Sequence, residues 1–259
     1  LAELRPIPPA VLGAQESARA ARHILPSDGE HTQPATIAPP SEKSANTPLI
    51  EAKHLVFGYH TDIPIVQNLS LTICRGEHTA IIGESGAGKT TLASLLLRLW
   101  EPDAGTISYD GIPHTKLPLE ASRAYFGAAL QGSWLFSASI RDNFLRLRGD
   151  IHETAIWHAL ETAQLADVVR ALPAGLDEPL GMNASRLSGG QRSRLLTALA
   201  LAGDAPILLL DEPTAGLDAA CGARLITSVL ADADARGATL IVITHDLPLL
   251  NQMKQVIKL

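Results

Sequence analysis

Aromatic residues and cysteines are both scarce in this chain of 259 residues. Aromatic side chains make up only 4% of the sequence, so a hydrophobic core has to consist mainly of Leu, Ile, Val and Ala. The two cysteines, Cys74 and Cys221, stand alone and show no metal-ligand spacing. They therefore predict buried thiols in a reduced, cytosolic compartment.

Long apolar runs and an excess of positive charge are also missing. No stretch reaches eighteen apolar residues and no secretory signal is present, so we expect no membrane span within the chain. The formal net charge is −6 and the pI is near 5.8, which argues against nucleic acid as a partner. A hydrophobic fraction of 46% with 19% charged residues is ordinary for a soluble globular protein with a substantial core.

Methionine is rare as well, and its positions bear on how the chain is organised. The only two are Met182 and Met253, and the chain begins at Leu1, so we expect a fragment, the C-terminal part of a longer polypeptide. Residues 9–25 carry apolar side chains at roughly helical spacing. Residues 26–48 are rich in Pro, Ser and Thr without periodicity, which predicts a linker and a domain boundary near residue 48.

One stretch fits the phosphate-binding pattern G-x-x-x-x-G-K-S/T at every fixed position. It consists of Gly83, Glu84, Ser85, Gly86, Ala87, Gly88, Lys89 and Thr90. A buried strand is predicted before it, at 78–82, and a helix is predicted after it, from Lys89 through Thr91 to Trp100. The alternative is a chance Gly-rich turn, which the flanking strand and helix disfavour.

The chemistry of this loop predicts a bound nucleoside triphosphate. Glycines let successive backbone N–H groups point at phosphate oxygens, and the helix start adds its positive dipole end. Lys89 is expected to reach the β- and γ-phosphates, and the Thr90 hydroxyl to bind Mg²⁺. A nucleoside triphosphate and Mg²⁺ are therefore the expected ligands.

Strands alternate with helices along the rest of the chain. Further strands are predicted at 49–57, 65–74, 106–109, 125–130, 207–210 and 239–244, with helices between about 133 and 188 and from 192 to 202. This alternation around a phosphate loop predicts an α/β fold with a mostly parallel sheet. The strand at 207–210 is apolar throughout, as expected of a strand buried on both faces.

Two carboxylates, Asp211 and Glu212, follow that apolar strand. We expect the strand to lie beside the phosphate-loop strand, with ligands at the carboxyl ends. Asp211 can then bind Mg²⁺, and Glu212 can act as general base toward the attacking water. The alternative is an acidic pair that caps a helix.

A second Gly-rich helix start lies at residues 187–191. Ser188 suits a helix N-cap, and Gly189 and Gly190, followed by Gln191, expose backbone N–H groups to an anion. The alternative is a plain Gly-rich cap. If the start does bind an anion, it either holds a second ligand or completes a site on another copy of the molecule.

Taken together, the phosphate loop, the Leu-Ser-Gly-Gly-Gln motif and the Asp-Glu strand end resemble the ATP-binding cassette (ABC) family, over about residues 49–259. The resemblance implies a P-loop NTPase core with a mostly parallel sheet, an antiparallel β subdomain and an α-helical subdomain at about 133–195. It also implies ATP hydrolysis coupled to transport, and adenine stacking on Tyr59. By the same resemblance, Gln131 binds Mg²⁺ and His245 contacts the γ-phosphate, both as catalytic residues beside Glu212.

Finer features are similar to the exporter branch of the family. They include residues 99–105 and 131–137, and the closest similarity is to the CydC-like subunit of a thiol or haem exporter for cytochrome assembly. Residues 1–25 then resemble the tail of a preceding membrane-domain helix. The resemblance implies a second cassette, identical or different, a fused or associated transmembrane domain, and a place on the cytoplasmic face of the inner membrane, the isolated fragment being soluble.

Two rival functions stay open at this point. A soluble ABC-type ATPase that remodels DNA or ribosomes is disfavoured, because residues 89–188 show no sustained heptads and only one phosphate loop is present. A module that dimerises on ATP without hydrolysis is disfavoured because both Glu212 and His245 are present.

Overall fold

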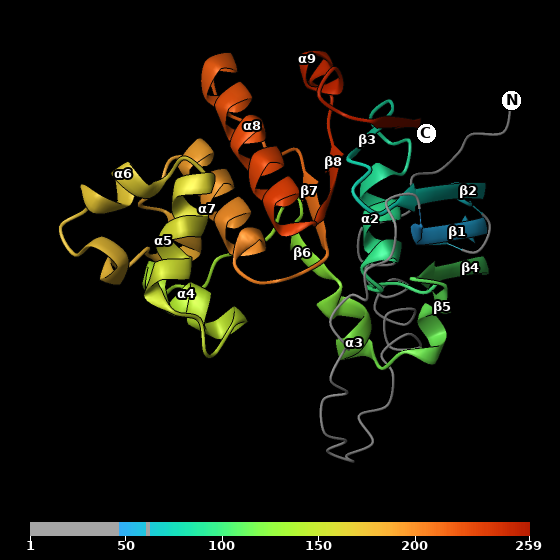
Figure 1. Ribbon diagram of the computed structural model, residues 1–259, viewed down its shortest axis with the longest axis horizontal. Coiled ribbons are helices and arrows are strands. Elements are labelled where there is room, and N and C mark those ends of the chain that lie inside the picture. Colours follow the sequence, from blue (N-terminus) through green and yellow to red (C-terminus); the bar gives the residue numbers. More distant parts are fainter. Residues whose placement is uncertain (1–46, 61–62) are drawn as a thin grey trace, which may run out of the picture.

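The computed structural model describes residues 47–60 and 63–259. Two sheets form its framework, and a helix lies between them (Figure 1). The helix predicted at residues 9–25 and nearly all of the predicted linker fall outside the described residues, so both stay predictions.

The larger sheet is parallel and has the strand order β6-β7-β8-β3-β9. Its strands are β3 (Thr79–Ile82), β6 (Phe126–Ala129), β7 (Ile207–Asp211), β8 (Thr239–Ile243) and β9 (Gln255–Lys258). β7 and β8 are buried at every position, which explains their continuous apolar sequence. The predicted parallel sheet is confirmed, but β7 is not next to β3 as expected, because β8 lies between them.

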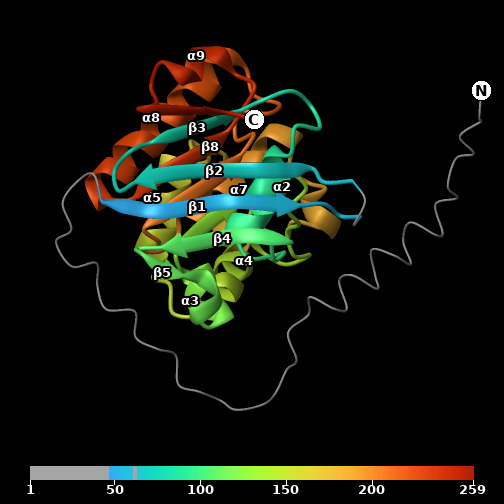
Figure 2. The same ribbon diagram turned by 90° about the vertical axis from the view of Figure 1, so that its right-hand side faces the viewer.

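The smaller sheet is antiparallel and has the order β2-β1-β4-β5. It contains β1 (Pro48–Phe57), β2 (Val66–Cys74), β4 (Ala104–Tyr109) and β5 (Ile112–Pro113). Figure 2 shows this sheet from its outer side, with the helix α2 (Lys89–Leu96) behind it. The antiparallel part of the expected fold is confirmed.

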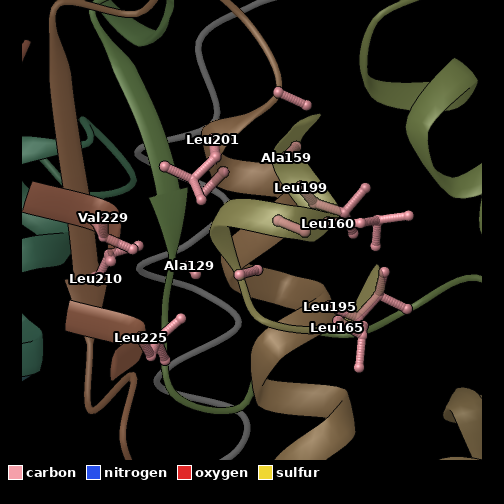
Figure 3. Close-up of a cluster of buried hydrophobic side chains, with 14 of the residues drawn as sticks. Ala129, Ala159, Leu160, Leu165, Leu195, Leu199, Leu201, Leu210, Leu225 and Val229 are labelled. Carbon is pink, nitrogen blue, oxygen red and sulfur yellow. The ribbon is translucent and has the colours of Figure 1, made fainter. Parts of the chain in front are cut away.

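The parallel sheet separates two hydrophobic cores. Alternate side chains of β7, such as Ile207 and Leu209, pack with α2 and the antiparallel sheet. The intervening Leu208 and Leu210 pack on the opposite face with the helices. Figure 3 shows this second core, in which Leu195 and Leu199 of α7 meet side chains from several other elements.

The helices of the second core come from the middle and the C-terminal part of the chain. They are α4 (Ile140–Leu147), α5 (Glu153–Thr162), α6 (Ala166–Arg170), α7 (Gly189–Leu201) and α8 (Ala219–Arg236). The remaining short elements are α3 (Leu119–Ala124), α9 (Leu247–Leu250) and the 3₁₀ turns at His114–Lys116, Gly175–Asp177 and Met182–Ala184. The expected helical subdomain is thus present, while its exact limits stay a prediction.

The helix expected to run to Trp100 ends at Leu96 instead. Arg98 has a φ of 53°, its N–H donates to Leu95 O, and Leu99 N–H donates to Ser94 O. These two bonds form a Schellman cap with Arg98 in the left-handed position that glycine usually takes.

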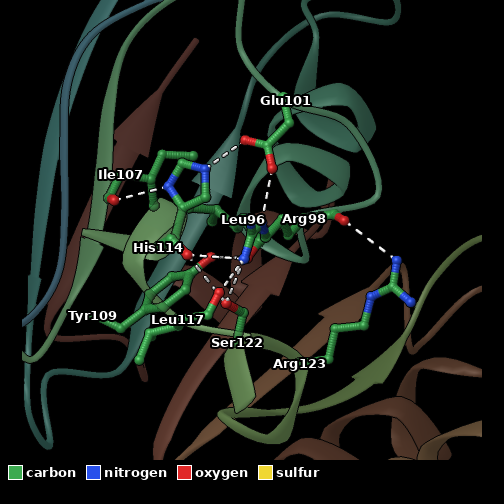
Figure 4. A network of polar contacts seen from close by, with 9 residues as sticks. All are labelled: Leu96, Arg98, Glu101, Ile107, Tyr109, His114, Leu117, Ser122 and Arg123. Atoms are coloured by element: carbon green, nitrogen blue, oxygen red, sulfur yellow. Dashed lines mark hydrogen bonds and ion pairs between the residues drawn. The ribbon is translucent and has the colours of Figure 1, made fainter. Parts of the chain in front are cut away.

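A polar network holds that helix end against the antiparallel sheet (Figure 4). The Arg98 guanidinium donates to Glu101, to the carbonyls of His114 and Leu117, and to Ser122. The Tyr109 hydroxyl donates to Leu96 O at 2.6 Å. These contacts offset the strain of a non-glycine residue at positive φ.

Candidate functional site

The predicted phosphate loop joins the end of β3 to the start of α2. Gly86 and Gly88 have φ values of 85° and 92°, a region that favours glycine. A Cβ on Gly88 would also come within 3.0 Å of the Ile65 side chain. The loop therefore requires glycine for conformation at both positions and for space at Gly88.

Lys89 is buried, and its side chain turns back along the loop. Its ammonium group donates to Gly83 O and Glu84 O, each at 2.9 Å. The cation therefore lies against the concave backbone where a phosphate would bind. The contact of Lys89 with the β- and γ-phosphates stays a prediction.

Thr90 and Asp211 meet across the sheet edge. The Thr90 hydroxyl on α2 donates to Asp211 Oδ2 at the end of β7, at 3.0 Å. Burial raises the pKa of Asp211, while the hydrogen bonds from Thr90 and from the Gln131 backbone N–H oppose that rise. Three separate segments thus converge on one carboxylate.

Glu212 lies just beyond Asp211 in a strained turn. Its φ is 52°, a left-handed value that is uncommon outside glycine and is found at functional sites. Its backbone N–H donates to Ile243 O at 2.9 Å, which fixes the turn against β8. The residue is therefore held in place by the sheet itself.

The Glu212 side chain is half-buried beside His245. Its Oε1 lies 3.4 Å from His245 Nε2, and it has no hydrogen-bond partner among the described residues. Burial raises the pKa of Glu212, and the nearby His245 opposes that rise. A buried acceptor without a partner is suited to receive a proton from a water molecule.

A pocket of about 240 Å³ collects most of the predicted site. Its lining includes Ser85, Gly86, Gly88, Lys89, Thr90, Thr91, Gln131, Asp211, Glu212 and His245. Ile65 also lines it, and sequence reasoning missed this residue, because an apolar residue just before a strand carries no local signal for a site.

Several predicted site residues do not line this pocket, namely Gly83, Glu84 and Ala87 of the loop, Tyr59, and residues 188–191. Tyr59 lies beside it, with its hydroxyl 3.5 Å from the Thr91 hydroxyl. Ser188 and Gln191 form a capping box at the start of α7, with bonds of 3.2 Å and 2.9 Å. Of that motif, Gly189 lines a second pocket of about 620 Å³, which Gln131, Asp211 and Glu212 also line.

The donor set fits a magnesium ion. Thr90 and Asp211 supply hard oxygen ligands, and Mg²⁺ in such sites uses one or two carboxylates together with substrate phosphates. Within residues 47–60 and 63–259, no cluster of three His, Cys, Asp or Glu side chains is arranged to hold a metal.

The parallel sheet, the glycine loop at its edge and the Thr90–Asp211 pair define a P-loop nucleotide-binding ATPase domain. A family model described as "ABC transporter" matches residues 66–215. The chain belongs to the ABC transporter family.

The relatives and the solved structures place it near the exporters. It is 44% identical over 161 residues to an "ATP-dependent lipid A-core flippase" of Neisseria meningitidis, covering 62% of this chain and 26% of that protein. A protein of the same name from Saccharophagus degradans is 40% identical over 198 residues, 76% of this chain and 33% of that protein. The "Structure of a bacterial Atm1-family ABC exporter with ATP bound" matches with a TM-score of 0.78 and 33% identity, covering 84% of this chain and 38% of that one.

The chain is thus an ABC nucleotide-binding domain similar to those of exporters. It spans about a quarter to a third of the length of these two curated relatives. Among the described residues, no helix is both long and apolar enough to cross a membrane. The finer resemblance to the CydC-like branch stays a prediction.

Proposed function

We propose that this chain binds Mg-ATP, closes with a second cassette around two nucleotides, and hydrolyses them to drive an exporter. The observation that carries the proposal is the pocket in which Lys89, Thr90, Asp211 and Glu212 meet. The site supplies a cation for phosphate, oxygen ligands for a metal and a buried base, which are the groups that phosphoryl transfer to water needs.

Each side chain has a distinct role in this proposal. Lys89 and the loop N–H groups bind the phosphates, and Thr90 and Asp211 hold Mg²⁺, which supplies charge neutralisation at those phosphates. Gln131 and His245 border the same pocket from two further loops, as Mg²⁺- and γ-phosphate-contacting residues. Glu212 accepts the proton of the attacking water, and a pKa raised by burial makes it a better base.

The division of the chain and its setting are part of the same proposal. Residues 49–259 are the cassette, 26–48 a linker, and 1–25 the tail of a membrane-domain helix that precedes it. Such a protein works at the cytoplasmic face of the inner membrane. Six membrane spans in the sequence upstream of Leu1 would support this division, and a preceding stretch without apolar spans would contradict it.

The exported compound is a further part of the proposal. The finer sequence resemblance favours a thiol compound or haem, whereas two relatives are named for lipid A core. Stimulation of ATP hydrolysis in the membrane-embedded protein tests the choice. A thiol compound or haem should stimulate turnover, and stimulation by lipid A core alone would exclude both.

The general-base role is tested by Glu212→Gln. The variant should bind ATP with unchanged affinity but hydrolyse it roughly a hundredfold more slowly or worse, the scale of a lost general base. A matched control is Glu161→Gln on the exposed surface of α5, which should keep parental turnover. Turnover of the Glu212 variant within a few-fold of the parent would assign the base to another residue.

Lys89→Ala tests the phosphate contact separately. It should weaken ATP binding itself, because a cation that contacts phosphate directly is lost. Unchanged ATP affinity would contradict the assignment of the loop.

A further inference from the structure

Tyr59 belongs to a cluster of three aromatic rings. The centroid of the Phe57 ring lies 5.2 Å from that of the Tyr59 ring, and the two ring planes make an angle of 84°. The centroid of the Trp100 ring lies 5.6 Å from that of the Tyr59 ring, at an interplanar angle of 83°. The ring centroids of Phe57 and Trp100 lie 6.0 Å apart. Neither neighbour is parallel to the Tyr59 ring, so neither of them takes a stacked position on its face.

The backbone beside Tyr59 is tied to the segment that follows Trp100. The Gly58 N–H donates to the Asp103 carboxylate at 3.0 Å, and the Asp103 N–H donates to Val56 O at 2.8 Å. A Cβ on Gly58 would lie 2.3 Å from Ile63 O, so the turn closes tightly at this point. The backbone that carries Tyr59 is therefore held from both sides.

The same segment is rigidly connected to the phosphate loop. Trp100 and Asp103 follow α2, whose first residues are Lys89, Thr90 and Thr91. The Schellman cap at Arg98 and the network around it fix the direction in which the chain leaves that helix. One helix thus sets the distance between the Tyr59 ring and the phosphate-binding lysine.

We propose that Trp100 and Asp103 are positioning residues for the nucleotide base. They fix the distance and the orientation of the Tyr59 ring relative to the phosphate loop. The base and the triphosphate of one ATP can then bind at the same time, and the protein does not have to order the ring on binding. The proposal rests on the proposed function and on the expectation from the sequence that adenine stacks on Tyr59. It assigns the geometry of that stack to residues outside the nucleotide contacts.

The test compares ATP with inorganic tripolyphosphate, which has no base. Trp100→Leu and Asp103→Ala should each raise the Kd for ATP roughly threefold to tenfold, a partial loss of a stacking contact. The Kd for tripolyphosphate should stay within about twofold, because the loop is untouched. At saturating ATP, turnover should be unchanged while KM rises.

A matched control and a double variant complete the design. Trp157→Leu removes a partly buried tryptophan from the other core and should change neither Kd. In a Tyr59→Ala background, Trp100→Leu should have no further effect on ATP binding, because its partner ring is gone. Trp100→Phe should restore most of the affinity, because an aromatic contact is kept.

Two results would overturn the proposal. Equal weakening of ATP and tripolyphosphate would show that Trp100 merely supports the whole loop, and full additivity with Tyr59→Ala would show that it acts elsewhere. If Tyr59→Ala itself leaves ATP binding unchanged, the expected stacking of adenine on Tyr59 is wrong and this proposal falls with it, while the tests of Lys89 and Glu212 stand separately.

A second readout applies if the leucine variant does not fold. The chain has three tryptophans, so Trp134→Phe with Trp157→Phe leaves Trp100 as the only one. ATP should change the fluorescence of Trp100 through the adjoining Tyr59 ring, and tripolyphosphate should not. No change with ATP, or the same change with both ligands, would contradict the proposal.

Discussion

At the scale of single residues, two buried histidines are each held by contacts to both ring nitrogens. The Leu240 N–H donates to His78 Nδ1 at 3.0 Å, and His78 Nε2 lies 3.0 Å from Asp234 Oδ1. His114 faces acceptors on both sides, Ile107 O at 2.8 Å and Glu101 at 2.6 Å. Glu101 thus contacts His114 through one carboxylate oxygen, and its other oxygen accepts from Arg98 at 2.7 Å.

Glu101 consequently makes the fold sensitive to acid. Burial alone would raise the pKa of Glu101, but the hydrogen bonds from His114 and Arg98 outweigh it and lower that pKa to about 2. A lowered pKa gives stability that is complete above the ordinary value of 4.5 and is lost as the pH falls toward 2.

Glu101→Gln tests this linkage. Removing the charge should lower the free energy of unfolding at pH 7 by roughly 1–3 kcal/mol, because an amide NH2 replaces one of the two carboxylate oxygens that contact Arg98 and His114. The difference from the parent should shrink as the pH is lowered from 4.5 toward 2. Urea unfolding at several pH values measures both, with Glu120→Gln on the exposed face of α3 as the control. A difference that stays constant with pH would contradict the assigned pKa.

At the scale of elements, the sequence predicted strands better than helix ends. Continuous apolar runs identified β7 and β8 because both faces of those strands are covered. The end of α2 was placed at Trp100 because no glycine or proline comes earlier in the pattern. The left-handed residue is Arg98, and the contacts that stabilise it come from residues 16 to 24 positions further along.

The close crossing of β6 and α7 is another contact that no local pattern reveals. A Cβ on Gly127 would lie 2.1 Å from Ala200 O, which is backbone and cannot move aside. Gly127 lies in β6, four positions before Gln131. The crossing therefore also fixes the start of the loop that follows β6 and carries Gln131.

Gly127→Ala should therefore affect both stability and activity. Overpacking of this kind costs typically about 1–3 kcal/mol, and a shifted β6 would displace Gln131 and slow hydrolysis. Gly149→Ala is the control, since nothing lies within 4 Å of its Cβ, and it should be nearly neutral. Thermal unfolding and ATPase rates measure the two effects. A fully stable Gly127 variant would mean that the two backbones can separate at no cost.

At the scale of the whole molecule, the sequence singled out most of the residues that line the Lys89 pocket but not how the strands bring them together. Two short motifs of adjacent residues singled out Lys89 with Thr90 and Asp211 with Glu212, because the residue types in each motif imply a chemical role. The insertion of β8 between β3 and β7, and the pairing of β9 with β3, depend on long-range packing that no short pattern encodes. Ile65 and the contacts of Trp100 were missed for the same reason.

The position of Ser188 leads to a prediction about assembly. None of residues 188–191 lines the pocket that contains Lys89, and the start of α7 is exposed at Ser188 and Gly189. We therefore expect each nucleotide to lie between the phosphate loop of one chain and the Ser188 helix of another, as a site completed by a second copy. ATP then contributes to the affinity between the copies by mass action.

Two measurements test this composite site. Turnover per molecule should rise with protein concentration, because closure of free chains depends on their encounter. Ser188→Arg should bind ATP normally but lose turnover, and mixing it with Glu212→Gln should restore part of the activity, since one mixed site pairs an intact base with an intact Ser188. Thr154→Arg adds the same charge at an exposed position of α5 and should leave turnover unchanged. Constant specific activity across a hundredfold dilution, without recovery on mixing, would show that one chain forms the complete site by itself.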